Sequence, residues 1–201
     1  MRSIGVALLV AMVVATAACS RDPGLDVQPM ASPMGASAPV GVVTEIIPPA
    51  EVRRSQAGAV SQRVANTEIT VTYSRPVARG RELFGGIVPH GQVWNPGADQ
   101  ATAVVFSRDV TVNGQPLTAG KYSIWTIPNP QSFTLIFSRA GDVYHTPYPG
   151  EAQDALRLEI VPESAPHSEM LTFDFPSVDV KEAVLRFRWG TTGVPVTIVV
   201  P

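Results

Sequence analysis

Apolar and polar residues alternate with a period of two along most of the chain beyond residue 68. A strand with one buried face has this period, and β-branched and aromatic residues favour it. Each run is short and is bounded by Gly, Pro, Asn or Asp. This pattern, together with short apolar runs, predicts strands at residues 69–73, 103–106, 122–127, 133–137, 156–160, 171–175, 185–189 and 194–200.

A further signal is the dipeptide Asn113-Gly114 between Val112 and Leu117, which is typical of a two-residue hairpin turn. No stretch has a convincing period of 3.6, and only residues 151–155 suggest a single helical turn. About nine short strands with turn-rich connections predict an all-β fold, an antiparallel β-sandwich. A partly closed barrel is the second choice.

The first residues have the pattern of an export signal. Arg2 precedes an apolar run that is shorter than the roughly 20 residues of a membrane-spanning helix. Small residues then precede Cys19, the only cysteine, as in the lipobox of bacterial lipoproteins. We therefore expect a signal peptide at 1–18, a lipidated Cys19 and, from the usual sorting rule for Ser20, an exported outer-membrane lipoprotein facing the periplasm or the exterior. Cleavage after Ala17, which leaves Cys19 as a free thiol, is the alternative.

Composition divides the rest of the chain in two. Residues 19–59 contain many Pro, Ala and Ser and no aromatic residue, which predicts a disordered tether that begins at the lipidated cysteine. An edge strand at residues 42–47 is the alternative for part of it. Residues 60–201 then form the β-sandwich domain. Because the formal net charge of the chain is only −2, nothing suggests nucleic acid as a partner.

Candidate chemistry gathers between Ser74 and Thr102, where Gly and Pro fix the backbone around polar side chains. Arginine has a rigid fork of donors for an anion, Trp94 offers a flat face to a ligand, and Asp99 offers a carboxylate. Each also has a structural interpretation: the arginines pin the loop, Trp94 plugs the core, and Asp99 accepts backbone hydrogen bonds. The candidate binding residues are Arg75, Arg81, His90, Trp94, Asp99 and Thr102.

Catalytic and metal chemistry have weaker signals. His90 is a candidate general base beside Asp99, but no nucleophile motif such as G-x-S-x-G accompanies the pair. The histidines His90, His145 and His167 lack the spacing of metal ligands, so we predict no metal and no cofactor. A second polar and aromatic cluster, with Tyr144 and Tyr148 around His145, either rims the same cleft or covers an edge of the sheet.

Seven short stretches together resemble one bacterial family, the DUF2911 family, a domain of unknown function in exported proteins. They are Tyr73–Pro76, Gly80–Gly85, Val88–Trp94, Gly97–Thr102, Val112–Gly114, Ala119–Ser123 and Ile127–Pro128. The resemblance covers Ser61 to Val200. The chain departs from the family pattern at His90, Asn95 and Asp99, where the family usually has an aromatic residue, Arg and Asn.

The resemblance implies no activity, so the function hypotheses come from the residues. The first is a non-catalytic, envelope-tethered domain that binds a small molecule, a glycan or an envelope protein through the loop between Arg75 and Thr102, with the membrane as partner of its lipid. The second is an envelope hydrolase centred on His90 and Asp99. The third is a purely structural envelope protein, whose long loop only stabilises the fold.

Overall fold

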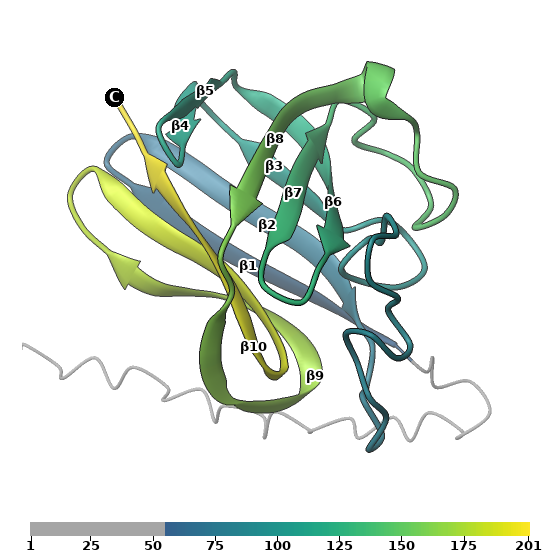
Figure 1. The fold of residues 1–201 in the computed structure, drawn as a ribbon. Helices are drawn as coiled ribbons and strands as arrows, with labels where there is room; N and C mark the ends of the chain where they lie inside the picture. The colour runs from purple at the N-terminus through teal and green to yellow at the C-terminus, as the bar shows by residue number, and fades with distance from the viewer. Residues whose placement is uncertain (1–54) are drawn as a thin grey trace, which may run out of the picture. The chain divides into compact units, whose positions relative to one another are not determined.

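Residues 55–201, the part of the chain that the computed structural model describes, form two antiparallel β-sheets packed face to face (Figure 1). One sheet has six strands in the order β1-β2-β3-β6-β7-β8, and the other has the order β5-β4-β10-β9. The strands are β1 Gln56–Val64, β2 Thr67–Arg75, β3 Ala103–Phe106, β4 Val110–Val112, β5 Gln115–Leu117, β6 Gly120–Pro128, β7 Phe133–Ser138, β8 Asp154–Ile160, β9 Glu163–Val178 and β10 Glu182–Val199. The predicted all-β sandwich is confirmed.

Local signals also have their expected outcomes. β4 and β5 pair with Val112 opposite Gln115, so that Asn113 and Gly114 form the two-residue turn. Both turn residues have positive φ, 46° and 79°, as a type I′ turn requires. The single helical turn expected near residue 151 is the 3-10 helix η1, Glu151–Gln153.

The long strand β10 bends near its middle and runs back beside its own beginning, as its ribbon shows in Figure 1. The backbone N–H of Val200 donates to the carbonyl of Lys181 at 2.9 Å, so the two ends of the strand lie side by side. Gly190, with φ of 60°, supplies a left-handed residue near the middle of β10. The two runs predicted at 185–189 and 194–200 therefore belong to one element.

The first strand extends the domain beyond the predicted boundary. β1 begins at Gln56 and pairs with β2 along its whole length, from Gln56 opposite Arg75 to Val64 opposite Thr67. Composition places residues 56–59 in the tether because they include no large apolar residue, but an edge strand held by one neighbour needs no bulky side chains. The predicted signal peptide, Cys19, the rest of the tether and the alternative strand at 42–47 lie outside the described residues. Within residues 55–201, no helix has the length and apolar character needed to cross a membrane.

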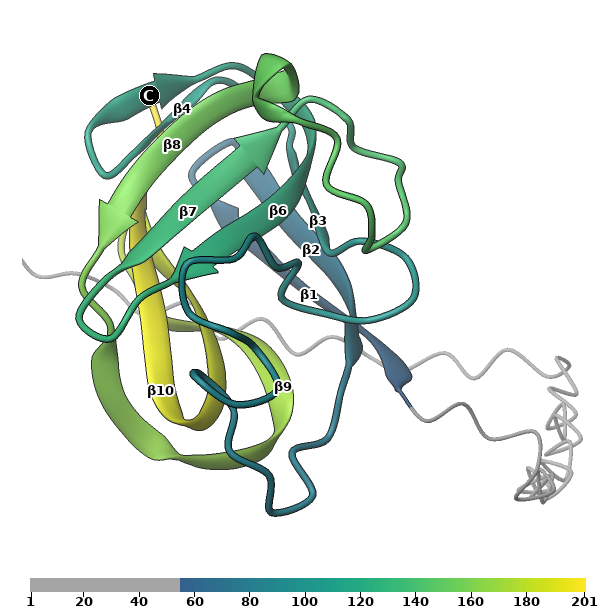
Figure 2. The same cartoon turned by 45° about the vertical axis from the view of Figure 1, so that its right-hand side comes forward.

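The core lies between the sheets, where the alternating apolar faces meet. Its largest fully buried side chains include Phe106, Phe137 and Ile124 from the first sheet and Leu171 from the second. A smaller cluster lies on the outer face of the first sheet, where Trp125 and Ile136 are covered by the segment between β7 and β8. The loops between β2 and β3 and between β7 and β8 lie over this end of the first sheet (Figure 2). The sheet is therefore buried on both faces there.

Candidate functional site

The loop between β2 and β3 closes one end of the sandwich through Trp94. The backbone N–H of Trp94 donates to Thr126 O at 2.8 Å and Thr126 N–H donates back at 2.7 Å, which ties the loop to β6. The indole stacks on Trp189, with 5.8 Å between ring centroids and 12° between planes. Phe84 meets it edge-on at 5.9 Å. Trp94 therefore seals the core, as its structural interpretation predicts.

Asn95 is a buried strut between the loop and β6. It is 1% exposed; its amide donates to Ile124 O at 2.7 Å, and its Oδ1 accepts the N–H of Thr102 at 3.1 Å. The Thr102 hydroxyl donates to Pro96 O at 2.8 Å. Gly97 is packed so closely that an added Cβ would lie 2.5 Å from Thr102 Oγ1. Thr102, predicted to bind a ligand, thus uses its hydroxyl inside the loop.

The predicted anion-binding arginines hold backbone carbonyls. Arg81 donates from Nε to Ala78 O and from Nη2 to Val77 O, both at 2.8 Å. Arg75 donates from Nη2 to Ala57 O at 3.1 Å, across the pairing of β2 with β1. The two bonds of Arg81 fix the plane of its guanidinium group, whereas Arg75 is held by a single bond. For Arg81 the third donor nitrogen, Nη1, has no partner within the described residues.

The structure pairs Asp99 with a different histidine from the one expected. The carbonyl oxygen of Asp99 accepts the N–H of His145 at 3.0 Å and lies 2.8 Å from His145 Nδ1. His90 is exposed, and its ring lies over Gly85, where an added Cβ would be 2.9 Å from Nε2. The contact of His145 with Asp99 joins two loops that are far apart in the sequence, so no spacing rule could have found it.

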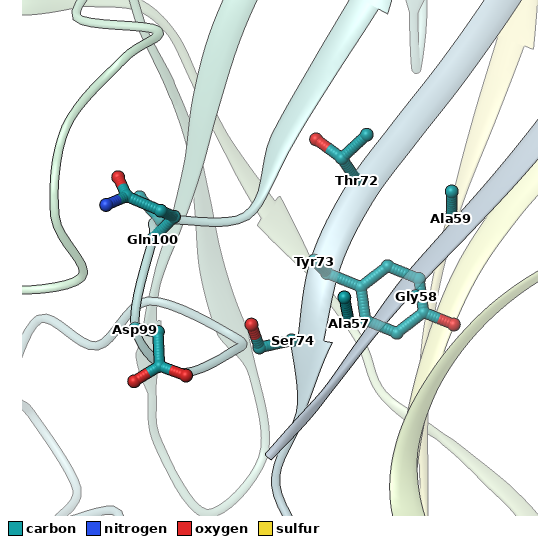
Figure 3. A pocket seen from close by; sticks show the side chains of 9 residues that line it. Ala57, Gly58, Ala59, Thr72, Tyr73, Ser74, Asp99 and Gln100 are labelled. Atoms are coloured by element: carbon teal, nitrogen blue, oxygen red, sulfur yellow. The ribbon is translucent and has the colours of Figure 1, made fainter. Parts of the chain in front are cut away.

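A groove of about 560 Å³ lies where β1 and β2 meet the end of the loop (Figure 3). In Figure 3, Thr72 and Ser74 point to the side on which Asp99 and Gln100 lie, while the Tyr73 ring points the other way. Ala57 pairs with Ser74 and Ala59 with Thr72. The lining residues are Ala57, Gly58, Ala59, Thr72, Tyr73, Ser74, Asp99, Gln100 and Ala101. The groove therefore has a largely apolar lining, with small side chains on its floor and with Asp99 and Gln100 at one side.

Sequence reasoning found only Asp99 among the lining of this groove. Its floor was missed because Ala57 and Ala59 resemble tether composition, and because Thr72 and Ser74 appear as the ordinary exposed face of β2. One signal was available: small residues recur at every second position from Ala57 to Ser61. This is the period of a strand that presents a flat face.

A second cleft, of about 400 Å³, lies between the loop and the turn of β10. It contains Arg81 from the loop and His167 and Glu169 from β9, above the apolar residues Leu83 and Phe84. The predicted site residues are therefore divided: Asp99 lines the groove, Arg81 lines this cleft, and His90 lines neither.

In the second polar and aromatic cluster of the sequence, Tyr148 covers the outer face of the first sheet. Its ring meets Trp125 at 5.3 Å, and its hydroxyl donates to Asp154. Arg157 also donates to Asp154, at 2.5 Å. Burial, and then the hydrogen bond to Asp154, raise the pKa of Tyr148 above its ordinary value. Within residues 55–201, no three His, Cys, Asp or Glu side chains are placed to hold a metal ion.

The family model described as a protein of unknown function, DUF2911, matches residues 55–198. The chain is a member of the DUF2911 family. The match begins at the residue before β1, so the DUF2911 domain includes the strand that sequence composition had left in the tether. No curated protein and no solved structure matches the chain.

Proposed function

We propose that this DUF2911 domain is a non-catalytic binding module of the cell envelope, and that its groove over β1 and β2 takes a hydroxyl-rich ligand such as a saccharide. The observation that carries the proposal is the groove itself, with its floor of small side chains and with Asp99 and Gln100 at its side. The lipid on Cys19 and the tether would hold the module at the membrane.

The chemistry of the lining supports a saccharide. A sugar ring has an apolar C–H face and a rim of hydroxyl groups. The methyl groups of Ala57 and Ala59 suit the face, and a carboxylate, an amide and two hydroxyls suit the rim. A carboxylate that accepts hydrogen bonds from sugar hydroxyls forms charge-assisted bonds, which are stronger than neutral ones.

The loop geometry holds Asp99 at the side of the groove. His145 engages the backbone carbonyl of Asp99, through its own backbone N–H and through Nδ1. Asp99 has a φ of 59°, so the backbone is held in a left-handed conformation that aspartate and asparagine tolerate better than other residues. The hydrogen bonds and the backbone conformation together fix the position of residue 99 beside the groove.

Titration of the purified full chain with a panel of mono- and oligosaccharides, followed by NMR, tests the proposal. Asp99→Asn retains the tolerated backbone conformation and removes the charge, and we expect it to weaken saccharide binding about tenfold, since a hydrogen bond to a charged group contributes about 1.5–3 kcal/mol. Asp179→Asn, at the turn before β10, is the matched control and leaves binding unchanged. Failure of every saccharide to bind, or equal effects of the two variants, would contradict the proposal.

A further inference from the structure

The second cleft is chemically distinct from the groove, and the two share no lining residue. Its charged walls are Arg81 on the loop and Glu169 on β9, and its apolar lining includes Leu83, Phe84 and Trp189. The β2–β3 loop is joined to β9 here, because the backbone N–H of Arg79 donates to Glu169 Oε1 at 2.5 Å. The positions of both walls are therefore fixed relative to each other.

The two opposite charges line one cleft without neutralising each other. Arg81 forms no ion pair within residues 55–201; its Nε and Nη2 are occupied by backbone carbonyls. Those bonds fix the plane of the guanidinium group and leave Nη1 available to donate to a ligand. Such a group can receive a carboxylate without first losing side-chain freedom.

The carboxylate of Glu169 is also held by hydrogen bonds. One oxygen accepts the Arg79 N–H, and the other lies 3.4 Å from His167 Nε2. Each carboxylate oxygen can accept a second hydrogen bond, so acceptor capacity remains for a cation in the cleft. The side chain is about half exposed, which keeps it accessible to a ligand from solution.

We propose that this cleft binds a zwitterionic α-amino acid with an apolar side chain. Its carboxylate pairs with Arg81, its ammonium pairs with Glu169, and its side chain lies on Leu83 and Phe84. A ligand with a single charge would satisfy one wall and face a like charge on the other. A zwitterion satisfies both, and the apolar floor selects against small polar amino acids.

NMR titration of the full chain with leucine, leucine amide and N-acetylleucine tests the proposal. Leucine amide lacks the carboxylate and N-acetylleucine lacks the ammonium, so each binds at least about tenfold more weakly than leucine. Saccharide binding in the groove is measured on the same sample, and its presence or absence does not alter this result.

Variants of the cleft residues test whether the ammonium group of the ligand pairs with Glu169. Glu169→Gln retains an oxygen that accepts the backbone N–H of Arg79 but removes the charge. It weakens leucine binding about tenfold, and it does not weaken the binding of N-acetylleucine, whose carboxylate no longer faces a like charge. Glu182→Gln, an exposed position outside the cleft, has no effect on either. Thr191→Tyr, at an exposed cleft residue, fills the space and abolishes leucine binding. Absence of leucine binding by the wild-type chain, or equal weakening of leucine and N-acetylleucine by Glu169→Gln, would overturn the proposal.

Discussion

Trp94 in the loop and Trp189 in β10 stack with 5.8 Å between their centroids and 12° between their planes. The contact joins the β2–β3 loop to the second sheet, and Trp189 is 2% exposed beneath it. The tryptophan that is the most obvious ligand platform in the sequence therefore completes the hydrophobic core.

Trp94→Ala should lower the free energy of unfolding by about 3 kcal/mol, the lower end for buried Trp, because Trp94 is only partly buried. Trp94→Phe retains an aromatic contact and should lose markedly less. Urea denaturation followed by circular dichroism measures both. A Trp94→Ala protein with unchanged stability and lost ligand binding would show that the indole is a ligand platform after all.

Asn95→Ala should lower the free energy of unfolding by about 2–4 kcal/mol, because Ile124 O and the Thr102 N–H lose their partner in a buried place. Asn66→Ala, in the exposed turn between β1 and β2, is the control and should stay within about 0.5 kcal/mol of the wild type. Equal unfolding midpoints for the two variants would argue against the strut.

Gly97→Ala should destabilise the protein through the contact of the new Cβ with Thr102 Oγ1, for which the structure leaves 2.5 Å. Thr102→Ala removes that oxygen. The double variant should therefore be less destabilised than the two single changes predict together, by about 1 kcal/mol or more in a double-mutant cycle. If the two losses of stability simply add, the loop relieves the contact by moving elsewhere, and the predicted clash with Thr102 Oγ1 is wrong.

Tyr148 predicts a dependence of stability on high pH. Its pKa is raised from the ordinary 10.0, so the folded protein holds the phenolic proton more tightly than the unfolded chain does. This contribution is fully present below pH 10 and is lost as the pH rises through the folded pKa. The stability difference between wild type and Tyr148→Phe should thus narrow above pH 10 in denaturation at several pH values. A difference that stays constant with pH would contradict the assignment.

The sequence was sufficient for the class of fold and for most of the strands, because period-two alternation and the Asn113-Gly114 turn are local signals. It predicted only residues 171–175 of β9, which spans Glu163–Val178. It was insufficient for β1, whose small residues are placed by pairing with β2 and not by a buried face of their own. The candidate site depended even more on distant contacts. Asp99 meets His145 and Arg79 meets Glu169 only after the sheets are assembled.

The same limit explains why the predicted site residues did not form one cluster. The Gly and Pro residues correctly predicted a loop with a fixed backbone conformation. The side chains of one loop, however, point into different environments. Trp94 faces the core, Thr102 faces the loop itself, and Asp99 faces the groove. Residue type and spacing do not determine which of these a side chain meets.

The central claim, that the groove over β1 and β2 is the binding site, is tested most directly by filling it. Ala59→Tyr places a large ring on the exposed floor, and Arg63→Tyr places the same ring on the same face of β1, about 13 Å along the strand at about 3.3 Å per residue. Saccharide titration of both variants is the measurement. We predict that Ala59→Tyr abolishes binding and that Arg63→Tyr binds as the wild type does; unchanged binding by a folded Ala59→Tyr protein would contradict the account.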